Sequence, residues 1–103
     1  MRFCFLPLVV SSLLFVPVSN ASEDPVSTAC QEVAQSAREV MTYRQDGVPM
    51  QEMMKVAGDV PDRKLMVEKA YDVPRQSSEA VQQGVIEGYA GEWFRACVKS
   101  HQQ

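Results

Sequence analysis

Residues 88 to 99 read GYAGEWFRACVK, and this stretch decides the fold. Its apolar residues recur at spacings of three and four, which at about 100° per residue places them on one face of a helix. That face comprises Ile86, Tyr89, Ala90, Trp93 and Cys97. The pattern predicts a long helix over about 78–100, starting near Ser77 or Ser78, with its cysteine in the last turn.

A second long helix is predicted over about 25–45. Asp24 is placed to cap it, and Pro25 suits the first helical position. Gly47 follows its end and favours the left-handed cap conformation. Its apolar face consists of Val26, Ala29, Cys30, Val33, Ala37, Val40 and Met41.

Two shorter helices are predicted between the long ones, over about 49–57 and 61–72. Gly58 closes the first, and Asp59 is placed to cap the second. The second stops at Val73-Pro74, because the residue before a proline avoids helical angles. The chain is therefore expected to be all-α.

The N-terminus has the features of a secretory signal peptide over 1–21. Arg2 precedes an apolar run from Phe3 to Val18, which ends at Ser19-Asn20-Ala21 with small residues at the cleavage positions. The alternative is an uncleaved anchor, although the run is short and interrupted for a membrane span. Cleavage after Ala21 leaves a single domain over 22–103, located in the periplasm or secreted.

Removal of 1–21 also removes Cys4 and leaves Cys30 and Cys97 as a pair. An even pair in an exported chain is typical of a disulfide. A bond between them joins the start of one long helix to the end of the other. We therefore expect a small four-helix domain with two long antiparallel helices and two short ones. In a reducing compartment the pair would instead be two buried thiols.

Three glycines lie on the opposite face of the last helix, where the core does not need them. This outer face contains Val81, Gly84, Gly88, Gly91 and Arg95. A glycine inside a helix costs roughly 1 kcal/mol relative to alanine. Three explanations stay open. Either a short helix packs closely against the glycines, or a helix held by the disulfide simply tolerates them, or a partner protein contacts them.

Candidate chemistry is sparse. Met50, Met53 and Met54 form a cluster whose thioethers suit Cu(I), although methionines at this spacing are more often core filler. His101 is the only histidine and is expected to be a solvated residue of the polar tail. No catalytic residues, cofactor or metal are expected. The whole-chain net charge of −3 becomes one unit more negative without Arg2, which makes nucleic acid an unfavourable partner.

The chain resembles a group of small exported proteins of uncharacterised activity from Gram-negative bacteria and their phages. The resemblance rests on Cys30, Arg44-Gln45, Gly47-Val48, Met50, Met53-Met54, Ala70-Tyr71, Pro74, Trp93 and Cys97. It implies export and a disulfide-bonded helical fold, and no catalytic residues. In outline only, the chain is also similar to acid-activated periplasmic chaperones.

The expected function is therefore that of a non-enzymatic periplasmic or secreted binding or accessory protein. Its partner is another protein or a second copy of the chain, with no membrane contact after signal cleavage. Two alternatives stay open. One is an acid- or stress-responsive periplasmic chaperone, and the other is a Cu(I)-binding protein that uses the methionine cluster.

Overall fold

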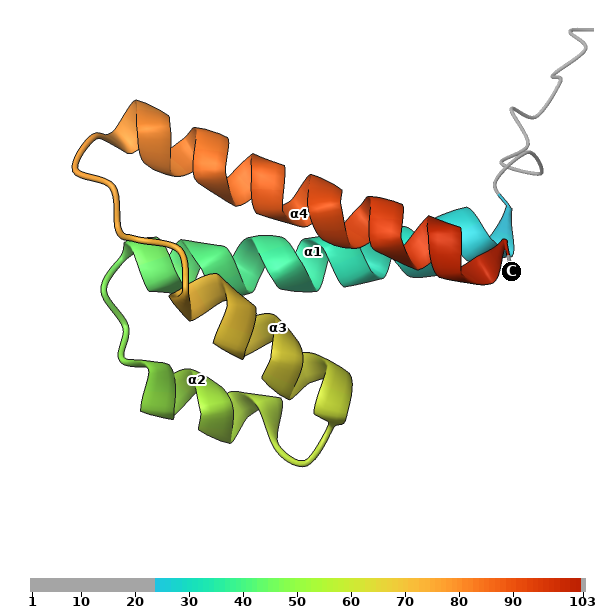
Figure 1. Cartoon of the computed structure of the whole chain (residues 1–103), viewed down its shortest axis with the longest axis horizontal. Helices are drawn as coiled ribbons and strands as arrows, with labels where there is room; N and C mark the ends of the chain where they lie inside the picture. The colour runs from blue at the N-terminus through green and yellow to red at the C-terminus, as the bar shows by residue number, and fades with distance from the viewer. Residues whose placement is uncertain (1–23, 103) are drawn as a thin grey trace, which may run out of the picture.

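The computed structural model describes residues 24 to 102, which form four α-helices (Figure 1). They are α1 (Pro25–Gln45), α2 (Met50–Ala57), α3 (Pro61–Tyr71) and α4 (Glu79–His101). The expected all-α, four-helix class is confirmed. The predicted signal peptide over 1–21 lies outside the described residues. Among the described helices, none is both long enough and apolar enough to cross a membrane.

The two long helices, α1 and α4, pack against each other in antiparallel directions, so that the start of α1 meets the end of α4 (Figure 1). The predicted bond between Cys30 and Cys97 joins them at that end. Each long helix has a side-chain cap at its start. Asp24 accepts a hydrogen bond from the Val26 amide, and Ser78 accepts one from the Val81 amide. These caps satisfy amides that have no partner inside the helix.

The main core lies where α1, α3 and α4 meet. Its buried members are Ala37, Met41, Met66, Ala70, Ile86 and Tyr89. Three residues of α1 differ from the predicted apolar face: Ala29 is exposed, whereas Ala34 and the polar Gln45 are buried. α1 packs against both α4 and α3. Its buried residues therefore lie on a face rotated from the one expected for packing against a single helix.

A smaller core cluster fixes α2 on α3 through Met53, Ala57 and Val67. Three helix ends differ from the prediction. Pro49 is the cap of α2 rather than its first residue, Asp72 caps the end of α3, and α4 continues through His101. The predicted Asp59 cap is wrong, because Val60 occupies the cap position of α3 and makes no side-chain hydrogen bond there.

The turn after α1 and the linker before α4 are held together by side-chain hydrogen bonds to backbone groups. Arg44 donates from Nε to the Val73 carbonyl at 2.9 Å, and Arg75 donates from Nε to the Gln45 carbonyl at 3.0 Å. The Tyr71 hydroxyl donates to the Val48 carbonyl at 2.6 Å. The Arg44 guanidinium also lies over the Tyr71 ring, 5.1 Å from its centroid. These contacts set the angle between the α2–α3 hairpin and the long pair.

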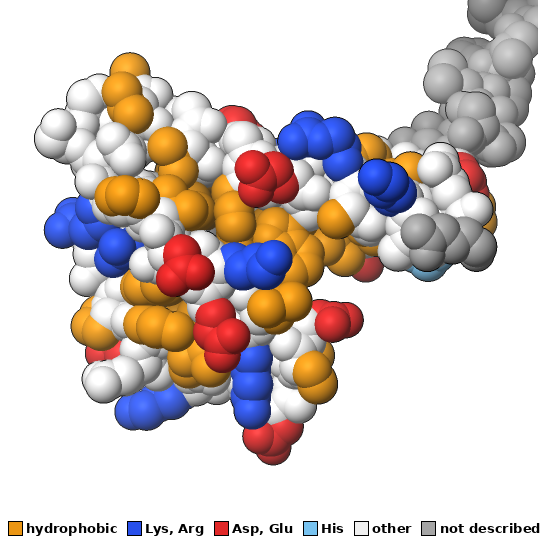
Figure 2. Space-filling model, viewed as in Figure 1, with side chains coloured by type: hydrophobic (Ala, Val, Ile, Leu, Met, Phe, Trp, Pro, Cys, Tyr) orange, Lys and Arg blue, Asp and Glu red, His pale blue; other side chains and the backbone are white. Residues whose placement is uncertain are grey.

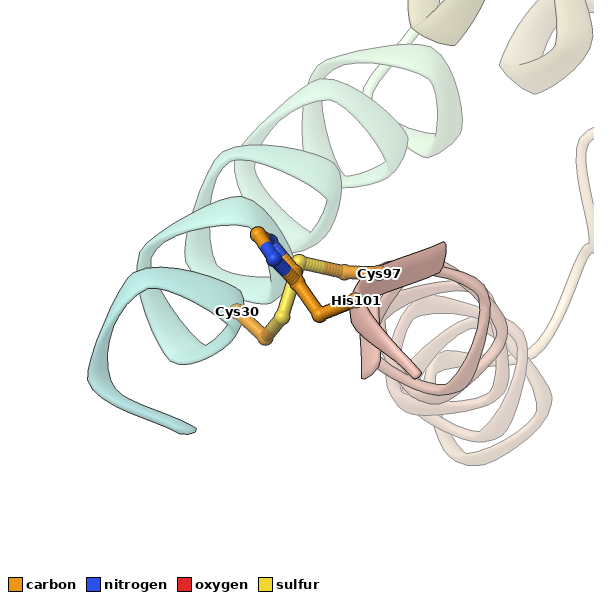
Figure 3. A group of neighbouring side chains, drawn as sticks. All are labelled: Cys30, Cys97 and His101. Carbon is orange, nitrogen blue, oxygen red and sulfur yellow. A yellow bond between two sulfur atoms is a disulfide. The ribbon is translucent and has the colours of Figure 1, made fainter. Parts of the chain in front are cut away.

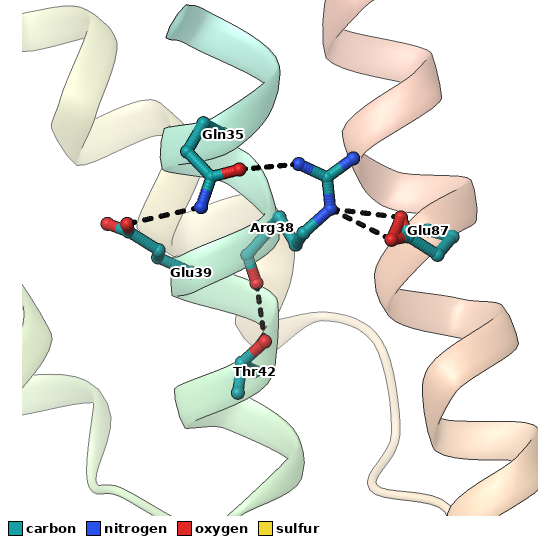
Figure 4. Close-up of polar contacts among 5 residues, drawn as sticks. All are labelled: Gln35, Arg38, Glu39, Thr42 and Glu87. Atoms are coloured by element: carbon teal, nitrogen blue, oxygen red, sulfur yellow. Dashed lines mark hydrogen bonds and ion pairs between the residues drawn. The ribbon is translucent and has the colours of Figure 1, made fainter.

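One ion pair crosses directly from α1 to α4. Both carboxylate oxygens of Glu87 accept from Arg38 Nε at 2.9 Å, while Gln35 accepts from another nitrogen of the same guanidinium at 2.7 Å (Figure 4). Both partners are partly exposed, so the pair fixes geometry more than it stabilises the fold. It joins the two helices away from their disulfide end.

Candidate functional site

A groove of about 660 Å³ lies between the disulfide half of the α1–α4 pair and the start of α3. We call it the Trp93 groove. Its apolar lining comes from Ala29 and Val33 of α1, Val60 and Met66 around α3, and Trp93 and Ala96 of α4. Figure 2 shows hydrophobic side chains gathered across the middle of the molecule, where the long pair meets α3. The core contacts of α3 lie in the half of the α1–α4 pair away from the disulfide, at Ala37 and Met41 of α1 and at Ile86 and Tyr89 of α4, and this leaves the groove open at the disulfide half.

Trp93 is held in the groove wall by its neighbour one turn earlier. Its ring meets that of Tyr89 edge to face, with centroids 6.3 Å apart and planes at 68°. The buried Tyr89 hydroxyl donates to the Met66 carbonyl of α3. Burial raises the pKa of Tyr89 to about 12. Tyr89 is therefore neutral and held in place by its hydrogen bond to α3, and its ring fixes one side of Trp93. The rest of the Trp93 side chain remains partly accessible.

Charged side chains of both signs surround the apolar lining: Glu32 from α1, and Asp62 and Arg63 from the first turn of α3. The imidazole of His101 lies at the end of α4 on the same rim. An apolar floor with a mixed polar rim is the composition of many protein-binding surfaces. The sequence pattern assigned Trp93 to the core face, and the structure places it at the margin of the core, where it is half-buried.

The disulfide end of the groove also contains the only histidine. The two sulfur atoms of Cys30 and Cys97 and a ring nitrogen of His101 all lie within 4.8 Å of one another (Figure 3). The expectation that His101 belongs to a solvated tail is therefore only half right, since the residue is exposed but helical. The signal for this placement is in the sequence: Cys97 and His101 are four residues apart and share one helix face.

The outer glycine face of α4 is open. Within the described residues, a Cβ atom added to Gly84 or Gly88 would meet no other atom within 4 Å, so no helix of this chain packs closely there. Gly91 differs, because its added Cβ would lie 3.2 Å from the Arg95 guanidinium. Gly91 and Arg95 line a shallower groove beside the Arg38–Glu87 pair, and Val81 is half exposed at the start of the helix. Of the three explanations, close packing of a short helix is not what the structure shows.

The methionine cluster does not form one surface. Met53 is 5% exposed in the smaller core cluster, Met54 packs against that cluster, and Met50 is 38% exposed. Met53 and Met54 therefore fill space between α2 and α3, as methionines at this spacing usually do.

Comparison of the chain with protein-family models, with curated proteins and with solved structures finds no match.

Proposed function

We propose that this is a non-enzymatic periplasmic or secreted binding protein that holds an apolar stretch of another polypeptide in the Trp93 groove. The observation that carries the proposal is the groove itself: about 660 Å³ between three helices, with the only tryptophan of the chain in its wall. Cavities that hold ligands typically measure about 300 to 1,000 Å³. Tryptophan is among the residues most often responsible for binding energy at protein interfaces.

The shape of the groove favours a polypeptide as its occupant. Its lining is drawn from α1, α3 and α4, so an occupant lies along the helices rather than inside an enclosed chamber. The apolar strip suits aliphatic side chains, and Glu32, Asp62 and Arg63 are available to polar groups at the margin. Such a surface selects apolar segments with polar flanks.

The walls are fixed before any partner arrives. The Cys30–Cys97 bond joins the two long helices beside the groove, and the Tyr89 hydroxyl ties α4 to α3 at Met66. A rigid groove loses little conformational freedom on binding, which favours affinity. The disulfide also suits an oxidising compartment, in agreement with the predicted signal peptide.

Site-specific photo-crosslinking tests the proposal. A benzophenone side chain is placed at Ala96, which is exposed and lines the groove, and in a matched protein at Val81, which is exposed on the outer face. We expect a defined adduct from the exported fraction at Ala96 and not at Val81. The sole tryptophan then reports binding of the purified partner as a shift in fluorescence.

A blocking variant distinguishes binding in the groove from non-specific binding to the surface. Ala96→Arg puts a cation into the apolar lining, whereas Ala80→Arg makes the same change at an exposed site in the first turn of α4. Loss of binding in Ala96→Arg alone supports the groove. Adducts at Val81 in place of Ala96, or equal binding by both arginine variants, would overturn it and favour the outer face.

An acid-responsive chaperone is the second candidate, favoured by the ion pair between Arg38 and Glu87. This pair fixes the geometry of α1 and α4 away from the disulfide, and its loss would let the two helices separate there and expose their apolar contact face. Suppression of client aggregation in acid by the wild type, but constitutively by Glu87→Gln, is the expected pattern. Absence of protection at every pH excludes this candidate.

A further inference from the structure

We propose that the disulfide end is a latent metal site: once the bridge is reduced, Cys30, Cys97 and His101 bind one Zn²⁺ ion. This inference does not depend on the function proposed for the Trp93 groove. It rests on the close placement of two cysteine sulfurs and one imidazole nitrogen, contributed by the start of α1 and the end of α4. The two sulfur atoms and an imidazole nitrogen already lie within 4.8 Å of one another.

The spacing is close to what zinc requires. With Zn–S near 2.3 Å and Zn–N near 2.0 Å, a tetrahedral ion holds its ligand atoms roughly 3.5 to 4 Å apart. The imidazole therefore needs to move by only about an ångström, and the sulfurs separate when their bond breaks. The Cα atoms of Cys30 and Cys97 are 5.5 Å apart, so side-chain rotation accommodates this separation without a shift of either helix.

The ligand set is selective. Thiolates favour soft or borderline ions such as Zn²⁺ and disfavour Mg²⁺ and Ca²⁺, which prefer oxygen. Cys97 and His101 are presented by consecutive turns of α4, and Cys30 comes from α1, so an ion would join the same two helices that the disulfide joins. Two sulfurs and one nitrogen leave the fourth tetrahedral position open for water or for a donor of a partner.

Access to the site comes from the Trp93 groove. Cys30 is fully buried, whereas Cys97 and His101 both line the groove. An ion can therefore reach the sulfurs from that side, and its open position would face the groove.

The chemistry balances with a dithiol reductant as co-reactant. The reductant supplies two electrons and two protons, the sulfur–sulfur bond breaks, and two thiols form while the dithiol becomes a disulfide. Zn²⁺ then displaces the two thiol protons and binds both thiolates and the neutral imidazole, so two protons are released for each ion bound.

The test uses the mature chain reduced under argon, with Co²⁺ as a spectroscopic substitute and Zn²⁺ measured by competition with a chromophoric chelator. We expect one ion per chain and the intense visible bands of tetrahedral Co²⁺ with thiolate ligands. The oxidised chain should bind neither ion. His101→Ala should weaken Zn²⁺ binding at least about tenfold, whereas the matched variant Gln102→Ala at the adjacent exposed position should not.

Far-ultraviolet circular dichroism accompanies each titration, because the reduced chain is less stable than the oxidised one. If reduction unfolds the helices, restoration of helicity by Zn²⁺ in the wild type, but not in His101→Ala, supports the site. Equal affinity of the wild type and His101→Ala overturns it, because binding then needs only two thiols. Failure of the reduced chain to bind either ion also overturns it.

Discussion

The side-chain oxygen of Gln45 accepts a hydrogen bond of 2.7 Å from the backbone amide of Gln76. Gln45 ends α1, and Gln76 lies in the linker before α4. The same side chain donates from Nε2 to the Pro74 carbonyl at 3.2 Å, although it is only 1% exposed. The buried side-chain amide of Gln45 thus supplies hydrogen bonds to two backbone groups of the linker that water would otherwise supply. It also joins the turn after α1 to the linker after α3, and the placement of α3 depends on both.

Replacement of Gln45 by alanine should destabilise the fold by about 1 to 3 kcal/mol, because it leaves the partly buried Gln76 amide without its acceptor and removes one of the two side-chain donors to the Pro74 carbonyl. Urea unfolding followed by circular dichroism measures the change. Gln51→Ala, at an exposed position of α2, is the matched control and should stay close to the wild type. An unchanged unfolding midpoint in Gln45→Ala would contradict the role given to this amide.

Tyr89 predicts a loss of stability in alkaline solution. Its pKa is raised to about 12 in the folded chain, mainly by burial, against the ordinary value of 10.0 for an exposed phenol. Between these values the folded state keeps a proton that the unfolded state has lost, so the free energy of unfolding falls as the pH rises. The difference approaches about 2 to 3 kcal/mol near the upper value. Below the lower value the contribution is constant.

The measurement for Tyr89 is a series of urea titrations across that alkaline range for the wild type and Tyr89→Phe. The variant should be less stable at neutral pH, because it loses the bond to the Met66 carbonyl, and its stability should depend less steeply on pH. Parallel pH curves for the two proteins would mean that another group causes the alkaline loss. Tyr71, whose pKa burial also raises, titrates in both proteins and therefore cancels from the comparison.

The helices could be predicted from the sequence because their signals are local. Asp24 and Pro25 start α1, Gly58 ends α2 and Pro74 prevents α3 from continuing, and each acts on the backbone within a turn of itself. The disulfide could also be predicted, since removal of the predicted signal peptide would leave a single pair of cysteines. That one long-range constraint was enough to make α1 and α4 antiparallel neighbours.

The burial of Gln45 and the Trp93 groove could not be predicted in the same way. Gln45 is polar, and it is buried only because the linker around Pro74 and Gln76 returns to cover it. The groove exists because α3 packs against part of α1, a relationship that no spacing within one helix encodes. Periodicity placed Trp93 on the core-facing side of its helix, but it does not indicate how far along α4 the contact with α3 extends.

Loss of the disulfide should destabilise the chain strongly. The bond joins residues 67 positions apart, and the loop-closure entropy for that length is worth about 4 kcal/mol. This is comparable with the whole stability of a small domain, so Cys97→Ser should be partly unfolded near physiological temperature. Thermal unfolding of Cys97→Ser and of the wild type, with and without reductant, measures the effect. A melting temperature in the wild type that does not respond to reduction would contradict it.

The glycines of α4 give a prediction of the opposite sign. Gly88→Ala should stabilise the chain by about 0.5 to 1 kcal/mol, because the added methyl group enters open space and alanine restricts the unfolded chain. Gly47→Ala should destabilise it, since Gly47 has a φ of +89° and its added Cβ would lie 3.1 Å from the Arg75 guanidinium. Thermal unfolding of the two variants beside the wild type provides the comparison.

If Gly88→Ala stabilises the chain and leaves crosslinking from Ala96 unchanged, the outer glycines are only tolerated and the groove is the binding surface. If it stabilises the chain but abolishes partner capture, the partner needs the space that glycine leaves. The outer face would then replace the groove as the site of contact.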